Sequence, residues 1–218
     1  MRGTTTTKNL ISQDTHYMSE VEVEKYVNEV ESEIKRHDVL MVVVPKQEYF
    51  EKTVEIAEIC SHLFERTCYV SMNKPATTLL DLWEKRGIDL KRFVIIDCVG
   101  EKGEQRVKII HVSSPIDLRG ISLAVREFID EGIKCLIFDS VSTLMLYEDP
   151  AEILKFIHVK ITRMRKHRVK GIFMSLKGDV NRKILEQMSM FVDRVISLSQ
   201  DSMERTGFER MVWLSEIE

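Results

Sequence analysis

Short apolar runs alternate with amphipathic segments along almost the whole chain, and this alternation limits the possible folds more than any other feature. The run 39–44 reads Val-Leu-Met-Val-Val-Val and has no polar face. A strand that is apolar on both sides is typical of a parallel sheet with helices on both faces. We predict further strands at 68–72, 93–97, 107–112, 134–139, 171–176, 192–198 and near 209–214.

Amphipathic segments between these runs predict helices. The segment 19–36 places Val23, Val27, Val30 and Ile34 on one face, and its early glutamates lie at the favourable end of the helix dipole. Further helices are predicted at 49–64, 77–85, 117–130, 150–167 and 181–190. Alternation with short joints is typical of right-handed βαβ crossovers. The sequence therefore predicts an α/β fold, with three layers and a mainly parallel central sheet between helices.

Domain organisation follows from length and composition. With 218 residues, 44% of them hydrophobic, the chain is long enough for one domain with a two-sided core. Residues 1–18 are polar and lack periodicity, so we expect a flexible tail followed by a single domain at 19–218. No uncharged stretch approaches the ~18 residues of a membrane span, and the chain begins without the apolar core of a signal peptide. We expect a protein that is neither secreted nor embedded in a membrane.

The four cysteines predict no special chemistry. Cys60, Cys68, Cys98 and Cys135 lie far apart and form no Cys-x-x-Cys motif or cluster with histidine. Free cysteine behaves as a small apolar residue in protein cores. We therefore expect buried, reduced thiols, no metal site and a cytoplasmic location.

Ligands in a doubly wound sheet bind beyond the carboxyl ends of the strands, so the junction after the first strand is the first place to search. There, Lys52 and Thr53 occupy the positions of the lysine and hydroxyl residue in a P-loop, GxxxxGK[ST]. Lys46 and Glu51 replace both glycines of that motif. The glycines allow backbone N–H groups to surround phosphate, and a carboxylate beside the site repels it. An open anion nest at 45–53 would favour nucleotide binding, whereas a helix or side chains filling that loop would not.

A second junction follows the run 134–139. It consists of apolar residues that end in Asp139 and Ser140, and it resembles the Walker B strand of RecA/KaiC-type proteins. In such a strand the aspartate helps to hold magnesium and its water shell. An aspartate at a strand end also caps ordinary turns, so this motif leaves a structural role open.

The order of segments carries a wider resemblance. The stretch 68–75, Cys-Tyr-Val-Ser-Met-Asn-Lys-Pro, with the following helix and the strand 93–97, is similar to the KaiC-like pattern that begins Tyr-Val-Ser-Phe-Glu-Glu. The segments 170–175 and 192–198 resemble the last strands of that pattern, including Asp-x-Val-Ile-x-Leu. Over 39–214 the chain thus resembles the RecA/KaiC-like P-loop ATPases. This resemblance implies a RecA-like domain and a candidate ATP/Mg site at Lys52, Thr53, Asp139 and Ser140.

The chain departs from that family where hydrolysis would occur. Asn73 and Lys74 stand where the family has glutamates that position or deprotonate the attacking water. An amide cannot act as a general base at neutral pH, and a protonated lysine cannot accept a proton. We therefore expect a degenerate member without catalytic residues, without a nucleotide cofactor and with negligible hydrolysis.

Charge is distributed unevenly. Residues 155–183 contain ten Lys/Arg and one acid, a local charge of +9, whereas 20–58 contain eleven acids and five Lys/Arg, a local charge of −6. A basic helix is often simply a solvated surface. It is also suited to a polyanion or to a neighbouring subunit, and the candidate residues are Lys160, Arg163, Arg165, Lys166 and Arg168.

These observations leave three functional hypotheses. The first is a pseudo-ATPase that acts by association, as a regulatory or scaffolding subunit of a prokaryotic assembly, with copies of itself or with a related RecA-like subunit. The second is a divergent ATP-binding protein that uses the partial P-loop and takes a catalytic residue from a neighbour. The third is a nucleic-acid binder that uses the basic stretch at 155–183.

Overall fold

Seven parallel strands form the centre of the described molecule. The computed structural model describes residues 20–101, 106–178 and 182–198, without the side chains of residues 20–26, 182, 183 and 185. The strands are β1 (Val39–Val44), β2 (Thr67–Ser71), β3 (Phe93–Asp97), β4 (Lys108–His111), β5 (Cys135–Asp139), β6 (Lys170–Leu176) and β7 (Arg194–Ser197). Their order in the sheet is β4-β3-β2-β5-β6-β1-β7, and every described strand pair is parallel.

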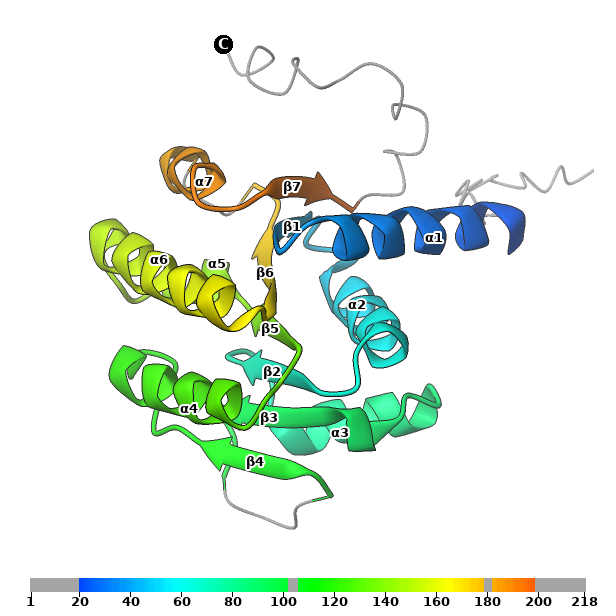
Figure 1. Ribbon diagram of the computed structural model, residues 1–218, viewed down its shortest axis with the longest axis horizontal. Helices are drawn as coiled ribbons and strands as arrows, with labels where there is room; N and C mark the ends of the chain where they lie inside the picture. The colour runs from blue at the N-terminus through cyan, green and yellow to red at the C-terminus, as the bar shows by residue number, and fades with distance from the viewer. Residues whose placement is uncertain (1–19, 102–105, 179–181, 199–218) are drawn as a thin grey trace, which may run out of the picture.

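Helices cover both faces of this sheet (Figure 1). The helices α1 (Glu20–Arg36), α2 (Tyr49–Leu63) and α3 (Ala76–Lys85) cover one face. The opposite face carries α4 (Leu118–Asp130), α6 (Pro150–His167) and α7 (Arg182–Ser189). The described residues also form two short elements, α5 (Val141–Leu144) and the 3-10 turn η1 (Leu90–Arg92). The structure confirms the predicted three-layer α/β class, and its sheet is wholly parallel among the described strands.

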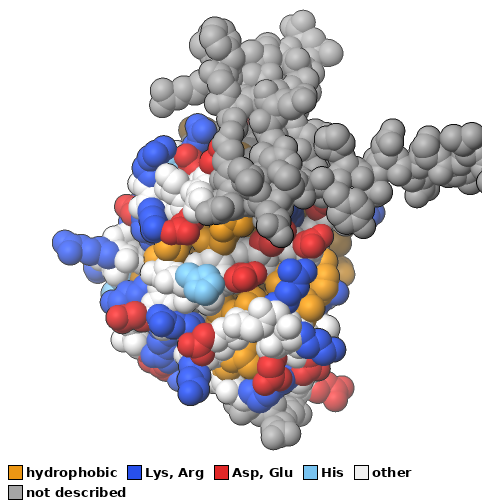
Figure 2. Space-filling view, turned by 90° about the vertical axis from the view of Figure 1, so that its right-hand side faces the viewer, with side chains coloured by type: hydrophobic (Ala, Val, Ile, Leu, Met, Phe, Trp, Pro, Cys, Tyr) orange, Lys and Arg blue, Asp and Glu red, His pale blue; other side chains and the backbone are white. Residues whose placement is uncertain are grey.

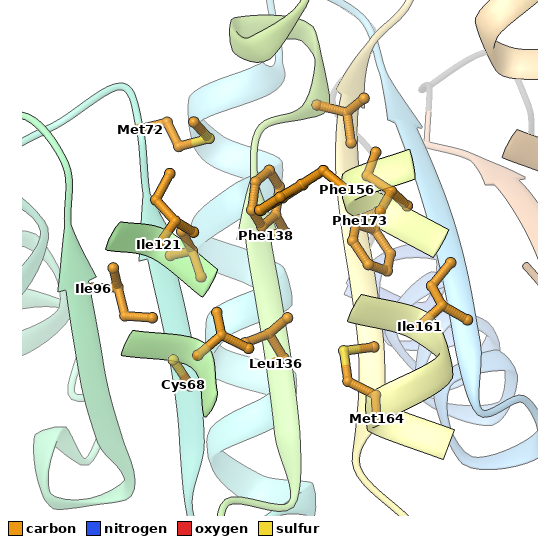
Figure 3. Close-up of a cluster of buried hydrophobic side chains, with 14 of the residues drawn as sticks. Cys68, Met72, Ile96, Ile121, Leu136, Phe138, Phe156, Ile161, Met164 and Phe173 are labelled. Atoms are coloured by element: carbon orange, nitrogen blue, oxygen red, sulfur yellow. The ribbon is translucent and has the colours of Figure 1, made fainter. Parts of the chain in front are cut away.

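Alternation along the strands divides the core into two apolar clusters. On β5, Leu136 and Phe138 pack with the α4–α6 side, whereas Cys135 and Ile137 pack with the α2–α3 side. This is the period of two that a strand covered on both faces requires. Figure 3 shows the first cluster, in which Phe138 lies beside Phe156 of α6, with 5.9 Å between ring centroids.

Most predicted elements occur within two residues of their expected bounds. The elements α5 and η1 were not predicted, because they are too short for helical periodicity to appear in the sequence. The tail predicted at 1–18 and the strand predicted near 209–214 lie outside the described residues. All four cysteines are buried and free, as predicted. Among the described residues, no helix has the length and apolar character needed to cross a membrane.

Candidate functional site at the carboxyl edge of the sheet

Because all strands run in the same direction, their carboxyl ends lie along one edge of the sheet. The loop from β1 to α2 occupies this edge and contains only four residues, Pro45 to Glu48. Its backbone forms a turn in which Glu48 N donates to Pro45 O at 3.1 Å, and Lys52 N donates to Glu48 O at 2.9 Å. The stretch 45–53 contains no residue with positive φ. Helix α2 therefore begins inside the stretch that a P-loop would use to surround phosphate, and local carbonyls already accept some of its N–H groups.

The P-loop-like side chains lie on the first turns of α2 and have partners there. The Lys52 ammonium donates to both carboxylate oxygens of Glu55, at 2.9 and 3.2 Å. The Thr53 hydroxyl donates to the carbonyl of Phe50 at 2.7 Å, one turn earlier. Both side chains are buried. Burial raises the pKa of Glu55, and the contact with Lys52 opposes that rise.

Asp139 is the centre of a closed hydrogen-bond network. Its side chain points to the α2–α3 side of the sheet, and the residue is 3% exposed. One carboxylate oxygen accepts from the Tyr49 hydroxyl at 2.5 Å and from Asn73 Nδ2 at 3.0 Å. The other accepts from the Tyr69 hydroxyl at 2.6 Å. Three donors from β2, α2 and the β2–α3 loop thus surround this carboxylate.

The electrostatics of this network follow from its burial. Desolvation raises the pKa of Asp139, and the hydrogen bonds from Tyr49, Tyr69 and Asn73 act in the opposite direction. Burial, followed by the nearby charge of Asp139, raises the pKa of both tyrosines well above the ordinary value. Both phenols therefore stay protonated and continue to donate to the carboxylate.

Ser140 and Asn73 extend the network into α5. The Ser140 hydroxyl caps this short helix by accepting from Thr143 N at 3.2 Å, and it lies 2.9 Å from the Thr143 hydroxyl. The Asn73 side chain also contacts Ser140 and accepts a hydrogen bond from Thr143. Asn73, identified in the sequence only as a missing general base, thus joins Asp139 to α5. Nearby, Lys74 places its ammonium 4.2 Å from the ring centroid of the half-exposed Phe50.

The structure brings two of the four predicted nucleotide-site residues, Asp139 and Ser140, into one network with the tyrosines. Asp139 and Ser140 are in one network with Tyr49, while Lys52 and Thr53 lie one turn further along α2. Sequence reasoning missed Tyr49 and Tyr69. For Tyr69 the available signal was its place within a predicted central strand, because a buried phenol normally requires a hydrogen-bond partner.

A second buried carboxylate at this edge has a structural role. Asp97, at the end of β3, accepts from the backbone N–H groups of Ala76, Val99 and Gly100 at 2.7–3.0 Å. It therefore fixes the start of α3 and the turn after β3. Its neighbour in register, His111 of β4, lies 3.9 Å away and has two enclosed ring nitrogens without hydrogen-bond partners.

The predicted partner surface on α6 changes in the folded chain. Lys160 is only 6% exposed, so its prediction as a surface residue is wrong. Arg163 pairs with Asp130 at 2.9 Å, and Arg165 pairs with Asp193 at 2.6 Å. Lys166 and Arg168 are exposed. The sequence analysis assigned Lys160 to the helix surface because a charged side chain is normally exposed to solvent.

Family membership can be tested by sequence. A model of a family of unknown function, DUF7090, matches residues 65–208, which is more than half of the chain. The chain belongs to this family. No curated protein matches it significantly in sequence.

The fold can be compared with two solved structures, one of which has a TM-score above 0.5. The flagellar accessory protein FlaH from Methanocaldococcus jannaschii is similar, with a TM-score of 0.52 at 12% identity, covering 73% of this chain and 70% of FlaH. The KaiC-like protein PH0186 from Pyrococcus horikoshii OT3 has a TM-score of 0.46 at 16% identity, covering 76% of this chain and 74% of PH0186. Together with the parallel sheet, the likeness to FlaH confirms the RecA/KaiC-like fold that the sequence predicted.

Proposed function

We propose that this chain is a RecA/KaiC-like pseudo-ATPase that acts through protein association as a regulatory or scaffolding subunit. The observation that carries the proposal is the enclosure of Asp139 by Tyr49, Tyr69 and Asn73. Magnesium bound at Asp139 would have to displace these donors. Each displaced hydrogen bond to a charged group costs about 1.5–3 kcal/mol, which opposes binding.

The first test is nucleotide binding. We expect MgATP to bind with a Kd above about 1 μM, weaker than about −8 kcal/mol, or not at all. Isothermal titration calorimetry of the full chain measures this, with Lys52→Ala as the matched control. Binding below 1 μM that disappears in Lys52→Ala would favour the alternative of a divergent ATP-binding protein. The presence of Lys52 and Thr53 on the first turns of α2 is the observation that keeps this alternative in the test.

The second test is turnover. Because Asn73 donates to Asp139 and cannot serve as a general base, we expect the isolated chain to release no phosphate above background. Steady phosphate release from MgATP that is lost in Asp139→Ala would contradict a pseudo-enzyme. The Asp139→Ala variant must be folded for this comparison, which circular dichroism checks.

The proposed function requires a surface for association with another subunit. We propose that the basic end of α6 meets the acidic stretch 20–58 of another copy or of a related RecA-like subunit. Since Arg163 and Arg165 already pair within the chain, Lys166 and Arg168 are the candidates for such contacts. Charge of this kind orients encounter more than it adds affinity, and surface ion pairs contribute about 0–1 kcal/mol each.

Light scattering across a salt series tests the association. We expect assembly that weakens as salt rises and that is reduced in the double variant Lys166→Glu/Arg168→Glu, but not in Lys85→Glu on the opposite helical layer. A monomer at every salt concentration would reject self-association. Salt-sensitive binding of DNA or RNA that is lost in the same double variant would instead support the nucleic-acid hypothesis.

A further inference from the structure

Lys160 is a buried lysine that has no anionic partner among the described residues. It lies in the middle of α6, is 6% exposed, and its ammonium is 5.1 Å from the ring centroid of Phe156. Within the described part of the chain its ammonium has no hydrogen bond and no ion pair. A buried charge without a partner is costly, and a ring face offsets only part of that cost.

A second donor on the same stripe of α6 also lacks an acceptor. Arg163 follows Lys160 by three residues, a spacing that makes side chains neighbours on a helix. Its Nη2 pairs with Asp130 of α4 at 2.9 Å, but its Nε is enclosed and has no hydrogen-bond partner. Asp130 also faces Arg126 at 3.8 Å, so this one carboxylate serves two arginines. Arg163 Nε is therefore an enclosed donor, three residues from Lys160, that no acceptor in the described part of the chain satisfies.

This surplus of positive charge favours a neutral amine. Burial, with a contribution from the charge of Arg163, lowers the pKa of Lys160 to about 8. A lysine that is desolvated and adjacent to another cation is a nucleophile at near-neutral pH. The residue keeps 6% of its surface exposed, and CO₂ is small enough to use such a narrow opening.

We propose that Lys160 is a carbamylation site at which the amine takes up carbon dioxide. The nitrogen lone pair attacks the carbon of CO₂, an N–C bond forms, and one C=O π pair moves onto oxygen. The N–H proton passes to solvent, which leaves a carbamate, –NH–COO⁻. The side chain thus changes from a cation without a partner to an anion beside Arg163.

The carbamate supplies the acceptor that this contact lacks. Its carboxylate extends Lys160 by one small planar group along the stripe that contains Arg163. Charge-assisted hydrogen bonds to a carboxylate are among the stronger ones in proteins, and arginine matches carboxylate geometry well. A free carboxylate or bicarbonate anion could accept hydrogen bonds from the same donors, but it would pair with a protonated Lys160. The carbamate and the free anion therefore differ in whether a covalent bond to Lys160 forms.

The test uses the full chain equilibrated with ¹³C-bicarbonate near pH 8. Carbamate is trapped as an ester with a trialkyloxonium reagent and located by peptide mass spectrometry, while ¹³C NMR detects it without trapping. We expect modification of Lys160 to exceed that of Lys166, an exposed lysine on the same helix, by about tenfold or more, because the ordinary lysine pKa is about 10.4. The signal should be lost in Lys160→Met, reduced in Arg163→Met and retained in Lys166→Met.

The wild-type peptide map decides the question even if a variant folds poorly. Equal modification of Lys160 and Lys166, or none at Lys160, would overturn the proposal. A ¹³C shift that reports bound bicarbonate, without any mass increase on the Lys160 peptide, would also overturn it by assigning the acceptor to a free anion.

Discussion

At the scale of single residues, the closed network around Asp139 is the most consequential feature of this protein. A carboxylate that is 3% exposed is tolerated because three donors surround it. The arrangement is rigid for the same reason, since loss of one donor leaves part of a buried charge unsatisfied. These hydrogen bonds connect the end of β5 to α2, β2 and the β2–α3 loop.

Tyr69→Phe tests this network. Removal of one hydroxyl should lower the free energy of unfolding by about 1.5–3 kcal/mol, the usual size of a hydrogen bond to a charged group. Urea denaturation followed by circular dichroism measures the change. Tyr147→Phe is the control, because Tyr147 is 63% exposed and should differ from wild type by less than about 0.5 kcal/mol. Equal effects of the two substitutions would show that Asp139 does not depend on the Tyr69 hydroxyl.

The buried Lys160 predicts a particular pH dependence of stability. Its pKa is about 8 in the folded chain, whereas the ordinary lysine value is 10.5, so the unfolded chain binds more protons between these values. Deprotonation of Lys160 should therefore increase the free energy of unfolding as pH rises from about 8 towards 10.5. Denaturation at several pH values in CO₂-free buffer should show this contribution in wild type and its loss in Lys160→Met. Parallel pH profiles for the two proteins would contradict it.

At the scale of elements, α6 is defined by signals at both of its ends. Asp149 caps the helix by accepting from Ala151 N at 2.8 Å, Pro150 occupies the first turn, and basic residues occupy the last turn. Arg168 ends it in the left-handed region at φ 55°. Such local signals explain why the sequence predicted 150–167 without error at either end.

The cap of α6 can be tested separately from its packing. Asp149→Ala should destabilise the protein by about 1 kcal/mol, within the range of 0.5–2 kcal/mol for lost N-caps. Lys155→Ala on the exposed face of the same helix should change stability by less than about 0.5 kcal/mol. Chemical denaturation compares the two variants. An Asp149→Ala protein as stable as wild type would mean that solvent replaces the cap fully.

At the scale of the whole molecule, one sheet separates two apolar clusters, and its central strands contribute side chains to both of them. Every strand from β1 to β6 contributes to at least one of the clusters, and Trp83 lies buried in the cluster on the α2–α3 side. Helix α6 of the basic stretch lies on the opposite face of the sheet from α1 and α2 of the acidic stretch. The face with α1 to α3 shows acidic and basic side chains mixed together (Figure 2). Association is therefore expected to depend on a local contact rather than on a uniformly charged face.

The connection between the two clusters predicts a single unfolding transition. Leu136→Ala opens a cavity on the α4–α6 side and should cost about 2–5 kcal/mol. Because the sheet is shared, tryptophan fluorescence, to which the buried Trp83 of the other side contributes, and circular dichroism should report the same shifted midpoint. Leu123→Ala, at a residue 58% exposed on α4, should have little effect. Separate midpoints for the two signals in Leu136→Ala would show that the clusters unfold independently.

The sequence by itself determined the strand and helix order and the mainly parallel sheet, because these depend on apolar periodicity and on local caps. The RecA/KaiC-like fold was predicted from the resemblance of its segments to that family. The sequence also identified Asp139 and the loss of the P-loop glycines. Only the tertiary structure decided which donors meet at Asp139, since Tyr49, Tyr69 and Asn73 come from segments separated by up to 90 residues. Lys160 was misplaced for the same reason: a lysine that follows helical spacing is assigned to solvent by its charge, whereas packing of α6 against the sheet and α4 decided its burial.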